Sequence, residues 1–307
     1  MTDPTPGGLH APPRLSRGAR VALVSPAGPL RGEEDVVRGI DNARTLGWEP
    51  VVGATVLGRR GYLAGSDAER AADLNRALAD PAVDAVWCLR GGYGVMRILD
   101  VLDYEALLTR PKAVIGYSDI TALHLAIGAR ARLISFHGPT ARGTLTPFSR
   151  DSLERAVVQG RDSCGVAGRA RTLHGGRAVG RLTGGNLALV AALIGTPYAA
   201  SLDGAILLLE DVGEAVYRID RMLRQLRLAG ALRGLRGIVF GAFTDRGDEA
   251  DALPLDDVLQ ETADALAVPC IAGAPIGHID DQWTLPLGAM AELDADARRV
   301  SVLRVGG

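Results

Sequence analysis

The chain has 307 residues, of which 47% are hydrophobic and 23% are charged, and its formal net charge is -2. This length allows two domains of roughly 100–200 residues each, and the composition is ordinary for a folded globular protein. A nucleic-acid-binding protein usually carries a basic excess, so we expect no nucleic-acid partner.

The three cysteines, Cys88, Cys164 and Cys270, are far apart and form no C-x-x-C pair. This pattern argues against a zinc site or a disulfide framework and favours a reducing, cytoplasmic location. The first 20 residues lack the continuous apolar segment of a signal peptide, and no apolar run approaches the roughly 20 residues that span a bilayer. We therefore expect no metal and no membrane partner, and we interpret residues 1–19 as a disordered tail.

Predicted strands and helices alternate through the first half of the chain. Apolar runs predict strands at 21–24, 50–54, 85–89, 113–116 and 133–136, and amphipathic spacing predicts helices at 33–46, 66–79, 95–99 and 119–129. Such alternation is typical of a mostly parallel sheet, whose reactive groups gather at the carboxyl ends of the strands. The residues that follow such ends are Gly28, Gly91, Gly92, Ser118 and His137.

The segment 151–177 is polar, contains several glycines and arginines and has no firm periodicity. We therefore place a linker at 163–178, between an N-terminal domain at 20–162 and a C-terminal domain at 179–307. In the second domain the pattern predicts helices at 184–194, 216–228 and 255–266, and strands at 205–209, 237–243, 290–293 and 300–305.

Ser118 lies in Gly116-Tyr117-Ser118-Asp119, where a predicted strand gives way to a predicted helix. This position resembles a nucleophile elbow, which exposes a serine hydroxyl at the top of a sheet. It departs from G-x-S-x-G because Ile120 replaces the second glycine. The alternative is that Ser118 only caps the following helix.

A serine nucleophile needs a base, a group that orients the base, and N–H donors for the oxyanion. Arg90-Gly91-Gly92-Tyr93-Gly94 follows a strand and can expose N–H groups, although it can equally be a tight turn. His278 stands in a glycine-flanked loop, where a general base or a surface histidine fits. Glu210 ends an apolar strand, where it can orient an imidazole, face solvent, or pair with Arg218 or Arg221.

Taken together in chain order, these segments resemble the LD-carboxypeptidase family of serine peptidases, which also contains the microcin C immunity carboxypeptidases. Each motif is weak alone, but the ordered set is specific and covers about residues 20–293. The matching motifs are Val24-Ser25-Pro26-Ala27-Gly28, Arg90-Gly91-Gly92-Tyr93-Gly94, Gly116-Tyr117-Ser118-Asp119-Ile120-Thr121, Phe136-His137-Gly138-Pro139, Gly184-Gly185-Asn186-Leu187, Leu209-Glu210-Asp211-Val212-Gly213-Glu214, Tyr217-Arg218-Ile219-Asp220-Arg221-Met222-Leu223, Gly277-His278 and Leu285-Pro286-Leu287-Gly288.

The resemblance implies an α/β protein with a flavodoxin-like or amidotransferase-like N-terminal domain and a smaller C-terminal α/β domain. It implies that Ser118 is the nucleophile, His278 the base and Glu210 the residue that orients the base, with Glu214 as the rival for that last role. The backbone N–H groups of Gly92 and Asp119 would form the oxyanion hole. It implies no cofactor and a homodimer.

The implied reaction cleaves an L–D amide bond and releases D-alanine from murein tetrapeptide, a small peptide, during cell-wall recycling. The candidates for substrate contact are Gly91, Tyr93, His137 and Trp283. One departure bears on the substrate: the family often has Met after Gly138-Pro139, and this chain has Thr140-Ala141-Arg142. An immunity-type hydrolase of peptidyl-nucleotides and a non-catalytic small-ligand-binding protein are the alternative functions.

Overall fold

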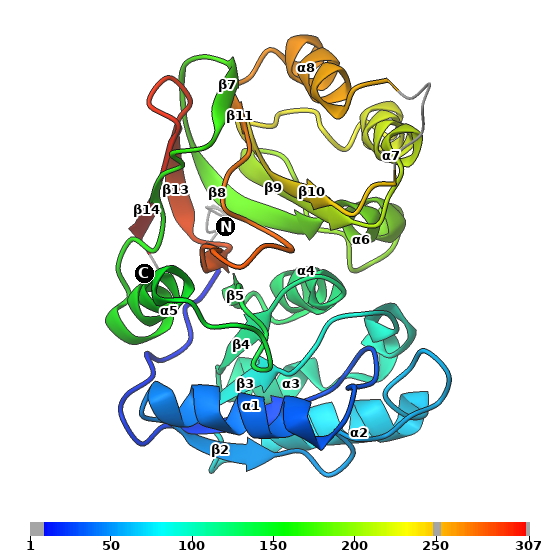
Figure 1. Ribbon diagram of the computed structural model, residues 1–307, viewed down its shortest axis with the longest axis vertical. Coiled ribbons are helices and arrows are strands. Elements are labelled where there is room, and N and C mark those ends of the chain that lie inside the picture. Colours follow the sequence, from blue (N-terminus) through cyan, green and yellow to red (C-terminus); the bar gives the residue numbers. More distant parts are fainter. Residues whose placement is uncertain (1–8, 248–252, 305–307) are drawn as a thin grey trace, which may run out of the picture.

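The computed structural model describes residues 9–247 and 253–304, and these residues form two helix-flanked sheets that lie one above the other in Figure 1. The first sheet has the strand order β12-β5-β4-β3-β1-β2, and its first five strands along the chain are parallel. This 2-1-3-4-5 order is that of the flavodoxin-like fold, so the predicted fold class is confirmed. The strands are β1 (Arg20–Val24), β2 (Glu49–Val52), β3 (Ala85–Cys88), β4 (Ala113–Gly116), β5 (Ser135–His137) and β12 (Leu285–Leu287).

Helices flank this sheet at the places where amphipathic spacing predicted the longer ones. Ser66 begins α2 with a complete capping box, because its hydroxyl accepts from the Glu69 N–H and the Glu69 carboxylate accepts from the Ser66 N–H. The predicted helix at 95–99 is instead two 3₁₀ turns. The helices are α1 (Glu33–Thr45), α2 (Asp67–Ala79), η1 (Val95–Arg97), η2 (Leu99–Val101), α3 (Tyr104–Thr109), α4 (Ile120–Arg130), α5 (Pro147–Glu154) and the π-helix η3 (Arg155–Gln159).

The second sheet has the strand order β6-β14-β13-β8-β9-β10-β11-β7. Its central strands β8 to β11 are parallel, and antiparallel strands complete both edges. Its strands are β6 (Gly165–Val166), β7 (Arg171–His174), β8 (Arg177–Asn186), β9 (Ala205–Val212), β10 (Gly237–Thr244), β11 (Cys270–Ala272), β13 (Met290–Asp294) and β14 (Arg299–Arg304). Its helices are α6 (Leu187–Leu193), α7 (Val216–Leu228) and α8 (Leu255–Leu266).

Two expected irregular segments are ordered parts of the fold. Within the expected linker 163–178, β6 pairs with β14 and β7 pairs with β11, so the segment belongs to the second sheet. These partners are distant in the chain, and periodicity within the segment does not show them. In the expected tail 1–19, residues 1–8 lie outside the described residues. The remainder packs on the first domain, where Leu15 and Ala19 are buried and His10 bridges to Leu133.

The contacts that join the domains include a strand pairing and a helix packing. Strand β12, from the C-terminal part of the chain, pairs antiparallel with β5 at the edge of the first sheet. Helix α4 packs against α6, and Figure 1 shows α4 between the two sheets. Because α4 is covered from both domains, every residue from Ile120 to Ile127 is buried. The turn that leads into α4, with Ser118 and Asp119, is therefore held at the domain interface.

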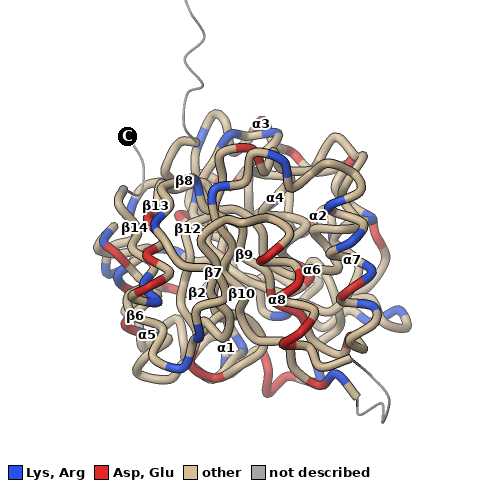
Figure 2. Tube along the Cα trace, turned by 90° about the horizontal axis from the view of Figure 1, so that it is seen from above, with Lys and Arg blue, Asp and Glu red and all other residues tan. Residues whose placement is uncertain are grey.

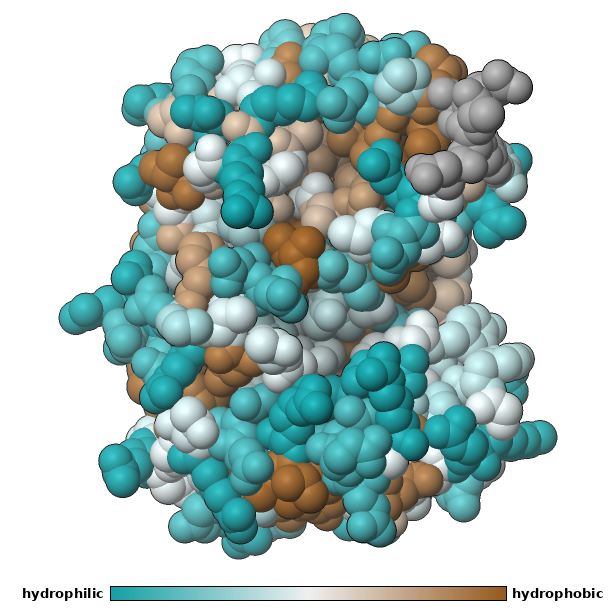
Figure 3. All heavy atoms as spheres, in the orientation of Figure 1, coloured by the Kyte–Doolittle hydropathy of each residue, from teal (hydrophilic) through white to brown (hydrophobic). Residues whose placement is uncertain are grey.

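In the two views drawn, neither charged nor hydrophobic residues gather into one large patch. Basic and acidic residues are interspersed in Figure 2, and the face in Figure 3 is mostly hydrophilic with small hydrophobic patches. Within residues 9–247 and 253–304, no helix is long and apolar enough to cross a membrane. The same residues contain no group of three or more His, Cys, Asp or Glu side chains that could hold a metal ion.

Candidate functional site

Ser118 occupies a strained turn between β4 and α4. Its φ angle is 66°, in the left-handed region that costs an L-residue roughly 1–2 kcal/mol. The Ser118 side chain does not cap α4, because Asp119 is the N-cap residue and its side chain makes no cap hydrogen bond either. Strain of this kind persists where surrounding structure imposes it, commonly at functional sites, and this turn is the geometry of a nucleophile elbow.

The Ser118 hydroxyl begins a chain of contacts that crosses the domain interface. Its Oγ lies 3.1 Å from His278 Nε2, and His278 Nδ1 lies 2.8 Å from Glu210 Oε2. Since an ionised carboxylate only accepts hydrogen bonds, Nδ1 is the protonated nitrogen and Nε2 is left to accept from the serine. The structure therefore brings together the three residues for which the family resemblance implied a triad.

The Glu210 carboxylate is enclosed, whereas the imidazole remains reachable. Glu210 is 0% exposed at the carboxyl end of β9, and the His278 side chain is 21% exposed. The Tyr117 ring contacts the imidazole edge to face at 4.8 Å. Glu214, the other candidate for the orienting role, instead pairs with Arg218, with 3.6 Å between Glu214 Oε2 and Arg218 Nη1. Glu210 alone of these two glutamates can hold the His278 tautomer.

The glycine loop after β3 lies directly against Ser118. A Cβ atom on Gly91 would lie 2.7 Å from Ser118 Cβ, and one on Gly92 would lie 2.9 Å from Gly28 Cα. Gly92 also has a φ angle of 113°, which L side chains rarely adopt. Glycine at these two positions therefore permits the backbone of this loop to lie this close to Ser118 and Gly28.

Replacing Gly91 by alanine is expected to lower kcat/KM about 100-fold, because the added methyl would displace the Ser118 side chain from His278. Steady-state kinetics on any cleaved peptide would measure this. Gly168→Ala is the matched control, since a Cβ there meets nothing within 4 Å. Equal rates for Gly91→Ala and Gly168→Ala would contradict the close approach.

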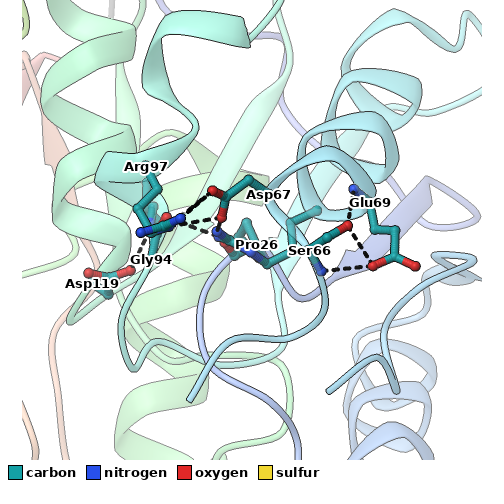
Figure 4. Close-up of polar contacts among 9 residues, drawn as sticks. Pro26, Ser66, Asp67, Glu69, Gly94, Arg97 and Asp119 are labelled. Atoms are coloured by element: carbon teal, nitrogen blue, oxygen red, sulfur yellow. Dashed lines mark hydrogen bonds and ion pairs between the residues drawn. The ribbon is translucent and has the colours of Figure 1, made fainter. Parts of the chain in front are cut away.

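Buried polar groups brace the same loop. The Asp119 carboxylate accepts from the Val95 N–H at 2.8 Å, which ties the residue after Ser118 to the end of the glycine loop. The buried Arg70 guanidinium donates to Gly94 O and Pro26 O, and so joins the loops that follow β3 and β1. Asp67 accepts hydrogen bonds from both Arg70 and Arg97, and Figure 4 shows the contact with Arg97. These hydrogen bonds, chiefly the one from Arg97, lower the pKa of Asp67 to about 2.

A pocket of about 220 Å³ opens beside the imidazole. Residues of both domains line it, and the sequence reasoning did not identify most of them as site residues. The residues that line it are Tyr117, Pro139, Thr140, Gly143, Thr144, His278, Ile279, Asp280 and Gln282. One sequence feature did indicate this pocket, namely that the residues after Gly138-Pro139 differ from the family pattern. Thr140, Gly143 and Thr144 belong to that loop.

The structure separates the predicted substrate contacts. Gly91 lies against Ser118, and Tyr93 is 52% exposed and packs edge to face on Tyr62 at 5.3 Å. Trp283 is only 2% exposed and His137 is 0% exposed. These two predicted contacts are therefore buried beneath the site surface. Strand position and aromatic character alone do not distinguish a residue under the site from one facing it.

His137 makes the folded state sensitive to acid. Its ring nitrogens have no hydrogen-bond partner among the described residues, and burial, followed by the charges of His124 and His278, lowers its pKa to about 3. The unfolded chain therefore binds a proton that the folded protein does not, between about pH 6.5 and 3.

The free energy of unfolding should fall by about 1.4 kcal/mol per pH unit because of His137 as the pH drops below 6.5. Urea unfolding at pH 7.5 and 5.5 should show a drop that is about 1 kcal/mol smaller in His137→Gln, and an unchanged drop would exclude this assignment.

Fold and site together define an α/β protein that holds a strained serine against a histidine–carboxylate pair across a domain interface. The model of the LD-carboxypeptidase N-terminal domain matches residues 21–138, and that of the LD-carboxypeptidase C-terminal domain matches residues 179–293. The chain therefore belongs to the LD-carboxypeptidase family.

Relatives of known name support this membership along nearly the whole chain. Murein tetrapeptide carboxypeptidase of Pseudomonas aeruginosa is 37% identical over 91% of this chain and 94% of its own length. A Streptomyces coelicolor protein, named a carboxypeptidase without an established activity, is 44% identical over 96% and 97%. The crystal structure of muramoyltetrapeptide carboxypeptidase from Oxalobacter formigenes superposes with a TM-score of 0.81 at 29% identity, covering 92% and 98%. The structure of MccF, a microcin C7 self-immunity protein, in complex with glutamyl sulfamoyl guanosine shares the fold, with a TM-score of 0.86 at 24% identity, covering 96% of this chain and 98% of that one.

Proposed function

We propose that this protein is a serine carboxypeptidase that cleaves an L–D amide bond and releases terminal D-alanine from murein tetrapeptide during cell-wall peptide recycling. The observation that carries the proposal is the continuous contact chain from Ser118 through His278 to the buried Glu210. The names of the Pseudomonas and Oxalobacter relatives support the choice of substrate. The homodimer and the cytoplasmic location stay predictions.

In the proposed mechanism, the Ser118 hydroxyl attacks the scissile carbonyl while His278 Nε2 takes its proton. Glu210 stabilises the imidazolium that forms. The backbone N–H groups of Gly92 and Asp119 would donate to the oxyanion of the tetrahedral intermediate. His278 then protonates the leaving D-alanine amine, and a water molecule activated by His278 hydrolyses the acyl-enzyme.

Mass spectrometry of incubated peptides tests the function. The protein should convert a murein tetrapeptide into the tripeptide and free D-alanine, and should leave the tetrapeptide with a terminal L-alanine intact. Failure to release D-alanine from any L–D tetrapeptide would refute the proposal. Cleavage of both stereoisomers would retain a carboxypeptidase but refute its L–D selectivity.

An immunity-type hydrolase of peptidyl-nucleotides is the second candidate, because MccF shares the fold. Such a substrate needs an aromatic face on which its base can stack. The buried Trp283 offers none, but Tyr62 and Tyr93 form an exposed pair next to the glycine loop. This candidate would be favoured if the wild type hydrolysed an aminoacyl sulfamoyl nucleoside and left the tetrapeptide uncleaved. Tyr62→Ala and Tyr93→Ala should then each lose hydrolysis of the nucleoside.

A further inference from the structure

Four arginines meet around the loop that follows β1. The Arg59 guanidinium donates to Leu30 O at 2.7 Å, and the Arg90 guanidinium donates to Pro29 O. The neighbouring Arg31 donates its backbone N–H to Asp35 Oδ2 at 2.9 Å, and the Arg142 guanidinium lies 3.3 Å from Asp35 Oδ1. These contacts, together with the charge interactions of Arg90 with Arg31, Arg59 and Arg142, bring residues of four separate segments to one place.

The positive charge of this cluster exceeds its negative charge. Asp35 is its acidic member, and it pairs with Arg142. Arg31, Arg59 and Arg90 form no ion pair with any residue that the structure describes. Burial lowers the pKa of Arg90, and the charges of Arg142, Arg31 and Arg59 lower it further, while Asp35 opposes them. A partly buried group of like charges is costly to maintain unless an anion binds there.

The cluster lies beside the reacting atoms. Arg90 Nε is 4.0 Å from the point where a Cβ of Gly92 would stand, in the loop that faces Ser118. Arg142 lies between Thr140 and Gly143, which line the pocket with His278 and Tyr117. Burial and then Glu210 raise the pKa of the Tyr117 hydroxyl, and the positive charge of Arg142 opposes this rise, so Arg142 is also close to the pocket wall.

The Arg142 side chain is held in place by a second set of contacts. The Asn42 amide on α1 donates to Ala141 O at 2.8 Å and to Gly143 O at 2.9 Å, so it clamps the loop on both sides of Arg142. Asp35 has a side chain only 3% exposed and anchors the guanidinium. The Arg142 side chain itself is 21% exposed. An arginine fixed in this way keeps donors available to a ligand at little entropic cost.

We infer that Arg142, with Arg90 beside it, binds the free carboxylate at the C-terminus of the peptide substrate, and that this contact makes the enzyme act at the chain end. The inference rests on the proposed function. A guanidinium matches a carboxylate with paired N–H donors, and the scissile amide of a carboxypeptidase lies one residue from that carboxylate. The donors must therefore lie within about one residue of the reacting carbonyl, and Arg90 belongs to the loop that faces Ser118 while Arg142 belongs to the loop that lines the pocket with His278.

Kinetics on a matched substrate pair test the inference. The wild type should cleave the tetrapeptide acid with a kcat/KM about 100-fold higher than the tetrapeptide with a C-terminal carboxamide, because a charged hydrogen-bonded pair is lost in the amide. Arg142→Gln should lower kcat/KM on the acid about 10- to 100-fold and leave the amide within about 3-fold. Arg142→Lys should recover part of the preference. Arg38→Gln, on the exposed surface of α1, is the charge-matched control and should behave as the wild type.

Calorimetric binding in the Ser118→Ala background separates this inference from the proposed function. The acid should bind more tightly than the amide, and adding Arg142→Gln should remove the difference. This readout answers the inference even if the wild type cleaves no tetrapeptide. Equal losses on acid and amide, or an acid preference that survives Arg142→Gln, would overturn it. The carboxamide peptide still carries any side-chain carboxylate of the diamino acid in the tetrapeptide. If Arg142→Gln weakened binding of the carboxamide peptide, Arg142 would be assigned to that side-chain carboxylate, and this result would also overturn the inference.

Discussion

Ser118→Ala is expected to reduce kcat for D-alanine release by about 10⁴- to 10⁶-fold, since the Oγ that forms the acyl-enzyme in the proposed mechanism is removed. Peptide binding should be retained, because the pocket residues are untouched. The measurement is D-alanine release under saturating tetrapeptide, with KM or Kd for the same peptide. A variant that keeps more than about a tenth of the wild-type rate would show that Ser118 is not the nucleophile.

Stability measurements on Ser118 variants give an independent check. Alanine keeps the side-chain strain of a left-handed φ of 66°, whereas glycine removes it. Ser118→Gly should therefore be at least as stable to urea as Ser118→Ala, despite the entropy cost that glycine usually adds. A clear loss of stability in Ser118→Gly would contradict strain at this turn.

Glu210→Gln is expected to lower kcat by about 10³- to 10⁴-fold. The amide can donate to His278 Nδ1, which would favour the tautomer with its proton on Nε2, and that tautomer cannot accept the Ser118 proton. The 2.8 Å contact in a fully buried position leaves no solvent to replace the carboxylate. The measurement is kcat for D-alanine release, with circular dichroism to show that the fold is kept.

Glu214→Gln is the matched control, because Glu214 follows four residues later and contacts Arg218 rather than the imidazole. We expect its kcat to stay within about 3-fold of the wild type, since a partly exposed ion pair contributes little and this one does not touch the imidazole. Similar losses in Glu210→Gln and Glu214→Gln would refute the assignment of the orienting role to Glu210.

Local patterns predicted the elements whose own residues contain the signal. The helix at 216–228 was placed at its observed bounds, because Ile219, Leu223 and Leu226 form one buried stripe. Strand β4 was likewise placed at 113–116 because it is apolar throughout and buried. Strand β12 was missed, since Leu285-Pro286-Leu287 is short and contains proline, and only its pairing with β5 makes it a strand.

The site divides in the same way. Ser118 alone is compatible with a simple helix cap, and the ordered motifs of a known family were needed to join it to Glu210 and His278. The arginine cluster could not be read from the sequence, because its members stand far apart and become neighbours only where the loops after β1, β3 and β5 meet. Burial also could not be read there, so His137 and Trp283 were expected at a surface that they lie beneath.

The pairing of β12 with β5 has a consequence for synthesis on the ribosome. The first domain has its five parallel strands when residue 137 has been made, but the edge of β5 has no partner until residues 285–287 follow. An unpaired edge is a place where chains associate wrongly. His278 is made only seven residues before β12, so the nascent chain carries Ser118 without its proposed base for nearly the same interval. Protection of the edge and assembly of the site are therefore completed by one late segment, and an incomplete chain is kept from acting as a hydrolase.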